Sequence, residues 1–86
     1  MMIKWEADAW ADYVEWQTDK AMLKRINRLI KEIQREPVSG IGKPEPLKHD
    51  LSGYWSRRID EMNRLVYRLE GETVIIAQCK GHYSPH

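Results

Sequence analysis

A carboxylate held between two prolines stands out among the residues whose types suggest chemistry. In the run Lys43-Pro44-Glu45-Pro46, each proline fixes its own φ and pushes the residue before it into extended geometry. Because a proline cannot donate to a β-ladder, Glu45 is predicted to lie on an edge strand or on a stiff loop beside one. Two interpretations are open: a rigid connector with a solvated glutamate, or a support that holds one carboxylate in a fixed place.

Basic side chains and a histidine accompany this carboxylate along the chain. They are Lys48, His49, Arg57, Arg58, Arg64, Lys80 and His82. Side chains of a strand alternate between the two faces of a sheet, so Arg57 and Arg58 are predicted to point to opposite faces. By the same alternation, a face left open by the helices is predicted to display a cluster of Arg58, Arg64, Lys80 and His82, within reach of Glu45.

One carboxylate, one histidine and several arginines suit the cleavage of RNA. A base removes the proton from a ribose 2′-hydroxyl, which attacks the adjacent phosphorus, and an acid protonates the departing 5′-oxygen. Cations stabilise the phosphorane, and the planar fork of arginine fits phosphate oxygens. The residue types alone leave the question open, because a lone histidine near a C-terminus is usually only exposed.

The composition is that of one small globular domain. The chain has 86 residues, 42% of them hydrophobic, so we expect a single domain over residues 1–86 with a core of marginal size. The single cysteine, Cys79, excludes an internal disulfide, and we expect no metal and no cofactor. Residues 1–6 lack a signal-peptide pattern and no apolar run reaches membrane-spanning length, which favours a cytoplasmic protein.

The net charge of +1 conceals two segments of opposite sign. Residues 1–19 carry one lysine and five acidic residues, a net charge of −4, whereas residues 20–36 carry six basic and two acidic residues, a net charge of +4. A basic middle beside an acidic start favours a surface for a polyanion. A solvated helix face gives the same count, so solubilisation remains the alternative.

Hydrophobic periodicity predicts two helices near the N-terminus. Residues 3–5 alternate as a short strand does, and residues 6–17 then follow helical spacing, with an apolar stripe of Ala7, Trp10, Ala11 and Val14. Asp19 is predicted to be the N-cap of a second helix that stops at Pro37. The apolar stripe of this second helix is Met22, Leu23, Ile26, Leu29, Ile30 and Ile33.

Strands are predicted in the second half of the chain, at residues 54–59, 64–69 and 73–79, with turns at 60–63 and 70–72. The last of these runs is the most β-prone and is predicted to be a central strand. The sequence therefore predicts an α+β fold, in which two helices pack on one face of a small antiparallel sheet.

A series of sequence blocks resembles one family over nearly the whole chain. The blocks are Trp5, Trp10, Trp16-Gln17, Gly42-Lys-Pro-Glu-Pro-Leu-Lys-His49, Leu51-Ser-Gly-Tyr-Trp-Ser-Arg-Arg-Ile59, Arg64-Leu-Val-Tyr67 and His82-Tyr83. They resemble the YoeB/Txe toxins, ribosome-dependent mRNA endonucleases of the RelE-like superfamily. The resemblance implies a RelE-like fold and a toxin of a type II toxin–antitoxin system, which inhibits translation by cleaving translated mRNA without a metal ion.

The resemblance also implies a role for each site residue. Glu45 matches the family's base, Arg64 the arginine that supports the transition state, and His82 the general acid, with Tyr83 beside it. The candidate RNA- or phosphate-binding residues are Lys48 and Arg58, which match the family's phosphate-contacting positions, and Lys43 and His49. Three further residues, Ser84-Pro85-His86, follow the tyrosine near which family members often stop.

The partners implied by the resemblance are a YefM-like antitoxin with a disordered acidic C-terminal segment, the ribosome with its mRNA, and a second copy of the chain, with no membrane. Two other functions stay open. The RelE-like fold also carries gyrase-inhibiting toxins, which bind a protein and lack the Glu, Arg and His set. A ribosome-bound RNA-binding module without chemistry is the other alternative.

Overall fold

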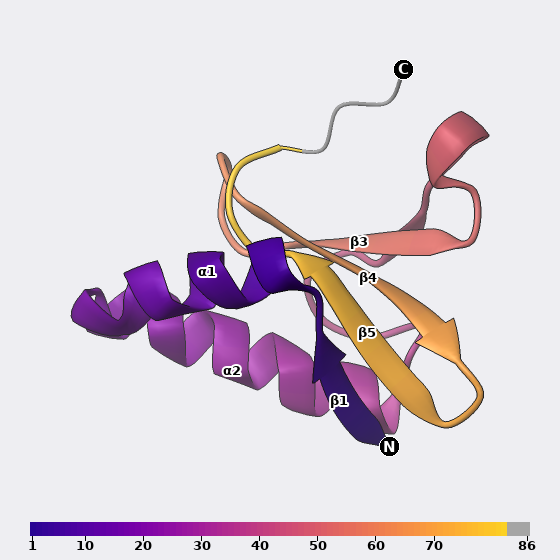
Figure 1. Ribbon diagram of the computed structural model, residues 1–86, viewed down its shortest axis with the longest axis horizontal. Coiled ribbons are helices and arrows are strands. Elements are labelled where there is room, and N and C mark those ends of the chain that lie inside the picture. Colours follow the sequence, from indigo (N-terminus) through magenta and orange to yellow (C-terminus); the bar gives the residue numbers. More distant parts are fainter. Residues whose placement is uncertain (83–86) are drawn as a thin grey trace.

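The computed structural model describes residues 1–82 and confirms an α+β fold (Figure 1). Its elements are β1 (Met2–Trp5), α1 (Ala7–Glu15), the 3-10 turn η1 (Trp16–Thr18), α2 (Lys20–Arg35), β2 (Glu45–Pro46), the 3-10 turn η2 (His49–Leu51), β3 (Tyr54–Arg58), β4 (Arg64–Glu70) and β5 (Thr73–Gln78). The predicted helices and strands are all present, with bounds within two residues of those expected.

The strands form one sheet in the order β1-β5-β4-β3-β2. Three of its pairs are antiparallel, as predicted, whereas β1 pairs with β5 in parallel. Parallel neighbours need a long connection, and the whole chain between β1 and β5 supplies it. The β-prone run Thr73–Gln78 lies between β1 and β4, so it is an interior strand, as predicted.

The core lies between the helices and one face of the sheet. The second helix buries four positions of its predicted stripe, Met22, Ile26, Leu29 and Ile33, against residues of β4 and β5. Its start is fixed as predicted, because the Asp19 side chain accepts a hydrogen bond from the Met22 N–H at 3.1 Å. No helix within residues 1–82 is long and apolar enough to cross a membrane.

The apolar stripe predicted for α1 is wrong, because this helix turns its other side inward. Trp10 and Val14 are 51% and 50% exposed, while Ala9 is fully buried and Tyr13 and Trp16 pack against the core. Tyr13 and Trp16 face inward because each also donates a hydrogen bond there, to Asn27 Oδ1 and to the Cys79 carbonyl. An outer stripe of apolar side chains therefore remains at the surface: Ala7, Trp10, Ala11 and Val14.

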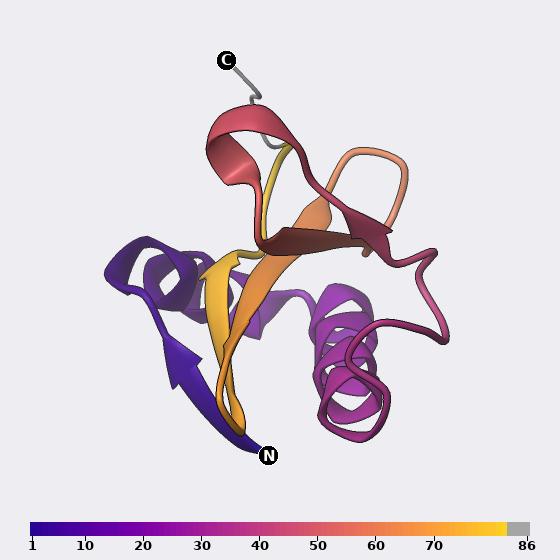
Figure 2. The ribbon, with the colours of Figure 1, turned by 90° about the vertical axis from the view of Figure 1, so that its right-hand side faces the viewer.

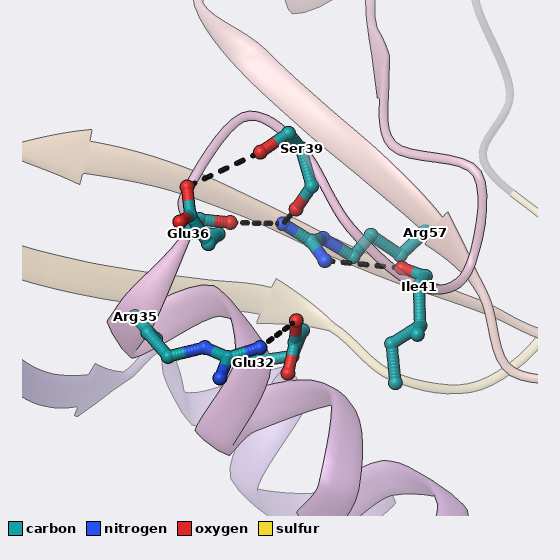
Figure 3. Close-up of polar contacts among 6 residues, drawn as sticks. All are labelled: Glu32, Arg35, Glu36, Ser39, Ile41 and Arg57. Carbon is teal, nitrogen blue, oxygen red and sulfur yellow. Dashed lines mark hydrogen bonds and ion pairs between the residues drawn. The ribbon is translucent and has the colours of Figure 1, made fainter.

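A buried arginine fixes the loop between α2 and β2 (Figure 3). Arg57 is fully buried, and its Nη2 donates to the carbonyls of Glu36 (2.5 Å) and Ser39 (2.8 Å). Its Nη1 donates to the Ile41 carbonyl at 3.0 Å and its Nε to the Tyr67 hydroxyl at 3.1 Å. Arg57 thus joins β3 and β4 to the loop that leads into Glu45.

Candidate active site

Glu45 lies on an edge strand, as the flanking prolines predict. It pairs with Ser56 and Pro46 with Trp55, and β2 is the last strand of the sheet. Lys43 differs from its predicted extended geometry, with a φ of 51°. The chain bends there because the Arg58 N–H donates to the Gly42 carbonyl at 2.7 Å and ties the loop to the end of β3.

The sheet register brings Glu45, Arg58 and Arg64 to the face that points away from the helices. Glu45 pairs with Ser56, and two residues further along β3 Arg58 pairs directly with Arg64. Directly paired residues share a face of the sheet. From strand spacing and rise, the Cα atoms of Glu45 and Arg64 lie about 12 Å apart. This separation leaves room for a nucleotide phosphate between the two side chains.

The two adjacent arginines of β3 lie on opposite faces, as predicted. Arg57 is buried, whereas Arg58 is exposed beside Arg64. Arg64 is half-buried, and its Nη1 is buried with no hydrogen-bond partner within the described part of the chain. A buried donor left unsatisfied is costly, so an acceptor atom placed at this nitrogen would be stabilising.

Side chains of α1 and η1 hold the chain where β5 ends. The Cys79 N–H donates to Asp12 Oδ2 at 3.3 Å, and Trp16 Nε1 donates to the Cys79 carbonyl at 2.8 Å. Both main-chain groups of Cys79 are therefore fixed. Burial, with a smaller contribution from the Asp12 carboxylate, raises the pKa of the Cys79 thiol to about 12. This thiol stays protonated at neutral pH and takes no part in chemistry there.

The next turn of the chain brings His82 to Arg64. The Arg64 N–H donates to the Gly81 carbonyl at 2.9 Å, and His82 follows Gly81 directly as an exposed residue. Strand alternation predicts His82 in one cluster with Arg64, but this main-chain contact could not be predicted from the sequence, because it lies beyond the last paired residues of β4 and β5. Tyr83, the fourth predicted catalytic residue, lies outside the described residues.

Lys80 does not join this cluster, so the prediction that placed it beside Arg64 is wrong. Its Nζ lies 2.6 Å from Glu15 Oε2 and 5.8 Å from the centre of the Trp16 ring. The alternation does not extend to Lys80, because β5 ends at Gln78 and the ion pair with Glu15 holds this side chain beside α1.

The remaining predicted RNA-binding residues, Lys43, Lys48 and His49, are exposed. Lys48 and His49 lie beside the start of β3, about 13 Å along that strand from Arg58. Figures 1 and 2 show η2 and the segment after β5 rising from the sheet on the side away from the helices. These two segments flank the face that carries Glu45 and Arg64.

A second group of cations lies at the edge of the sheet next to α2. Arg25, Arg28 and Arg58 line a cavity of about 170 Å³ whose other lining residues are Leu29, Ile41, Gly42 and Ile59. A larger groove of about 490 Å³ runs along α2, lined by Lys20, Leu23, Lys24, Asn27, Arg28 and Lys31. No acidic residue of the described chain lines either hollow, which suits both to a polyanion.

Metal ligands are not gathered in residues 1–82, where no group of three histidine, cysteine, aspartate or glutamate side chains is placed to hold an ion. The candidate groups that the register and the Gly81 contact bring together are instead Glu45, His82, Arg58 and Arg64. These types can remove a proton, donate a proton and stabilise negative charge.

Known proteins resemble the chain over nearly its whole length. A family model described as the YoeB-like toxin of bacterial type II toxin–antitoxin systems matches residues 5–83. Toxin YoeB of Escherichia coli (strain K12) is 54% identical over 84 residues, which cover 96% of this chain and all of that protein.

Solved structures show the same likeness in three dimensions. A YoeB/ParE toxin from Agrobacterium tumefaciens is 48% identical with a TM-score of 0.92, covering 96% of this chain and 100% of that one. The YoeB dimer from Staphylococcus aureus has 47% identity and a TM-score of 0.89, covering 96% and 98%, and that toxin is also solved in a YoeB–YefM complex. The chain therefore belongs to the YoeB-like toxins of bacterial type II toxin–antitoxin systems.

Proposed function

We propose that this toxin is a ribosome-dependent, metal-independent endoribonuclease that cleaves mRNA during translation and so inhibits translation. The observation that carries the proposal is the buried, unsatisfied Nη1 of Arg64 within the described chain, on the face shared with Glu45 and Arg58. A phosphate oxygen bound there would supply the missing acceptor. His82 follows the residue bonded to the Arg64 N–H, which supports the proposal that base, cations and acid act from one surface.

In the proposed reaction, the Glu45 carboxylate takes the proton of a ribose 2′-hydroxyl. The 2′-oxygen attacks the adjacent phosphorus while Arg64 and Arg58 stabilise the charge that develops on the non-bridging oxygens. His82 gives a proton to the departing 5′-oxygen, assisted by Tyr83. The products are a 2′,3′-cyclic phosphate and a free 5′-hydroxyl. No water and no metal ion enters this step.

Binding to the ribosome is proposed to use the cations around the site. Lys43, Lys48 and His49 are exposed near Glu45 in the chain, and the arginine cavity continues the positive surface toward α2. Contacts to phosphate fix the position of a protein on RNA but carry no sequence information. These residues are therefore proposed to place the message, while the catalytic side chains Glu45, Arg64, His82 and Tyr83 act on it.

The experiment that tests this function uses ribosomes programmed with a message that carries a single 2′-deoxynucleotide at the cleavage position. We expect cleavage of the all-ribose message to leave a 2′,3′-cyclic phosphate, and no cleavage at the deoxy position, because the attacking hydroxyl is missing. Cleavage that continues at the deoxy position, or that leaves a 5′-phosphate, would contradict the mechanism. Inhibition of a protein target such as gyrase with the message intact would favour the non-catalytic alternative.

We also propose that a YefM-like antitoxin inhibits this toxin through an acidic segment, in the cytoplasm where ribosomes translate. The support is the complex of the S. aureus relative and the cationic face around Arg58 and Arg64. Because an antitoxin binds the folded toxin, it should raise the melting temperature by mass action. Full cleavage activity in a saturated complex would defeat this proposal.

Two copies of the toxin are proposed to associate through the outer stripe of α1. The S. aureus relative is solved as a dimer, and Trp10 and Val14 are each about half exposed on this helix. Exposed apolar side chains at helical spacing are typical of a protein–protein contact. Trp10→Glu should therefore give a monomer in sedimentation, and an unchanged dimer would place the contact elsewhere.

A further inference from the structure

The turn between β3 and β4 is closed by one aspartate. Asp60 Oδ1 accepts from the N–H groups of Met62 and Asn63, both at 2.8 Å, and from Asn63 Nδ2 at 3.1 Å. Burial acts to raise the pKa of Asp60, but these hydrogen bonds outweigh it and hold that pKa below its ordinary value. The carboxylate is therefore charged at neutral pH and keeps the amide nitrogen of Asn63 turned toward it.

With its nitrogen turned to Asp60, the Asn63 side chain presents its oxygen to the end of the described chain. Asn63 Oδ1 accepts from the Gly81 N–H at 2.8 Å. The Gly81 carbonyl accepts from the Arg64 N–H at 2.9 Å and from Gln78 Nε2 at 3.2 Å. Both main-chain groups of Gly81 are thus held, although no strand includes this residue.

Glycine suits this position because Gly81 has a φ of 75°, in the left-handed region. An added Cβ would meet no atom of residues 1–82 within 4 Å, so the requirement set by this part of the chain is conformational and not steric. The residue after Gly81 is His82, and the residue after Asn63 is Arg64. Asn63 therefore fixes the main chain just before His82 relative to β4, the strand that begins with Arg64.

We propose that Asn63 is a positioning residue for RNA cleavage, which holds His82 beside Arg64 by binding the Gly81 N–H. This inference rests on the proposed function, in which His82 is the general acid. A proton donor must come within about 3 Å of the leaving oxygen, and a histidine outside any helix or strand meets that condition only if its main chain is held. Gln78 supports the same residue from β5.

The test measures single-turnover cleavage on programmed ribosomes saturated with toxin. Asn63→Ala is expected to slow cleavage roughly 10- to 100-fold, as misplacement of a reacting group does, with unchanged affinity for the ribosome. Met62→Ala is the matched control, because this side chain lies in the same turn and is 70% exposed. Gln78→Ala, which removes the other side-chain contact to Gly81, should slow cleavage less than Asn63→Ala.

A double-mutant cycle with His82→Ala separates positioning from a general loss of structure. If Asn63 acts through His82, adding Asn63→Ala to His82→Ala should change the rate less than about two-fold. The same 10- to 100-fold loss in both backgrounds would overturn the proposal, as would no loss in either. If His82→Ala alone leaves the rate unchanged, the failure belongs to the proposed function, because His82 is then not the acid.

Hydrogen exchange of the Gly81 amide gives a readout that does not depend on activity. Asn63→Ala should remove the protection of this amide in the free toxin, while Met62→Ala should preserve it. Protection that persists in Asn63→Ala would show that Asn63 does not hold the segment. Lost protection with an unchanged cleavage rate would show that holding it is irrelevant to the reaction. Either result overturns the proposal.

Discussion

Replacement of Arg57 by methionine is expected to destabilise the fold far more than the same change at Arg58. Methionine keeps an unbranched stem in the buried space but removes four donated hydrogen bonds. Two of the acceptors are carbonyls of the exposed residues Glu36 and Ser39, which can regain water. The acceptors at Ile41 and Tyr67 are more enclosed, so the expected loss of stability is calculated from the hydrogen bonds to these two acceptors.

The expected cost of Arg57→Met follows from these two bonds. A hydrogen bond to a charged group contributes about 1.5–3 kcal/mol, so losing two lowers the free energy of unfolding by about 3 kcal/mol or more. For a chain of 86 residues, the unfolding entropy is about 0.18 kcal/mol/K, and the melting temperature should fall by about 17 °C. The Lys43–Glu45 segment should become less ordered at the same time, because Arg57 holds the loop before it.

The assay is urea unfolding of the two single variants and the wild type. Arg58→Met is the matched control. Because the Arg58 side chain is exposed, this substitution should change the free energy of unfolding by less than about 0.5 kcal/mol. Equal losses from Arg57→Met and Arg58→Met would refute the assignment of these arginines to opposite faces. A loss below about 1 kcal/mol at Arg57 would refute the view that its hydrogen bonds organise the loop.

Three further predictions concern the site and its surroundings. Arg64→Ala should slow single-turnover cleavage about 10²–10³-fold. Arg68 lies on the same strand but is paired with Glu70 at 2.8 Å, so Arg68→Ala should leave the cleavage rate nearly unchanged. Equal losses of rate in the two variants would contradict a special role for Arg64. Changing Arg25 and Arg28 together to glutamine should reduce the slope of log K for ribosome binding against log salt concentration by about 0.7–0.9 per lost phosphate contact. An unaltered slope would show that these two arginines are only solvated and do not contact RNA phosphate. The pKa of Cys79 is raised to about 12 in the folded protein, so its contribution to stability is complete below pH 9 and is lost as the pH rises toward 12. Between pH 9 and 11 the wild type should therefore lose about 2 kcal/mol more stability than Cys79→Ala, and parallel curves would contradict this.

Local patterns in the sequence were sufficient to predict most elements and the faces of β3. The prolines around Glu45 indicate an edge strand, and the β-prone run near the C-terminus indicates an interior one. Alternation along a short regular strand also separates Arg57 from Arg58. These predictions succeed because each depends on the residues of one element and on a period that the element keeps.

Predictions fail where a distant contact or an irregularity decides the outcome. The inward side of α1 is set by hydrogen bonds from Tyr13 and Trp16 to other elements, and not by its most regular apolar stripe. β5 ends at Gln78, so alternation does not reach Lys80, which forms an ion pair with Glu15 instead of joining the predicted cluster. The parallel pairing of β1, and the contact between Asn63 and Gly81, join residues that are far apart in the chain, where no local pattern exists.

The central claim is that Glu45 acts as the base in cleavage of a translated message. The most direct measurement is single-turnover cleavage of mRNA on programmed ribosomes by the wild type and by Glu45→Gln, which keeps the size of the side chain but removes the base. We expect the wild type to cleave only the ribosome-bound message, and Glu45→Gln to bind equally well but cleave at least about 100-fold more slowly. Cleavage by Glu45→Gln at the wild-type rate, or a wild-type toxin that leaves the message intact, would contradict the proposed function.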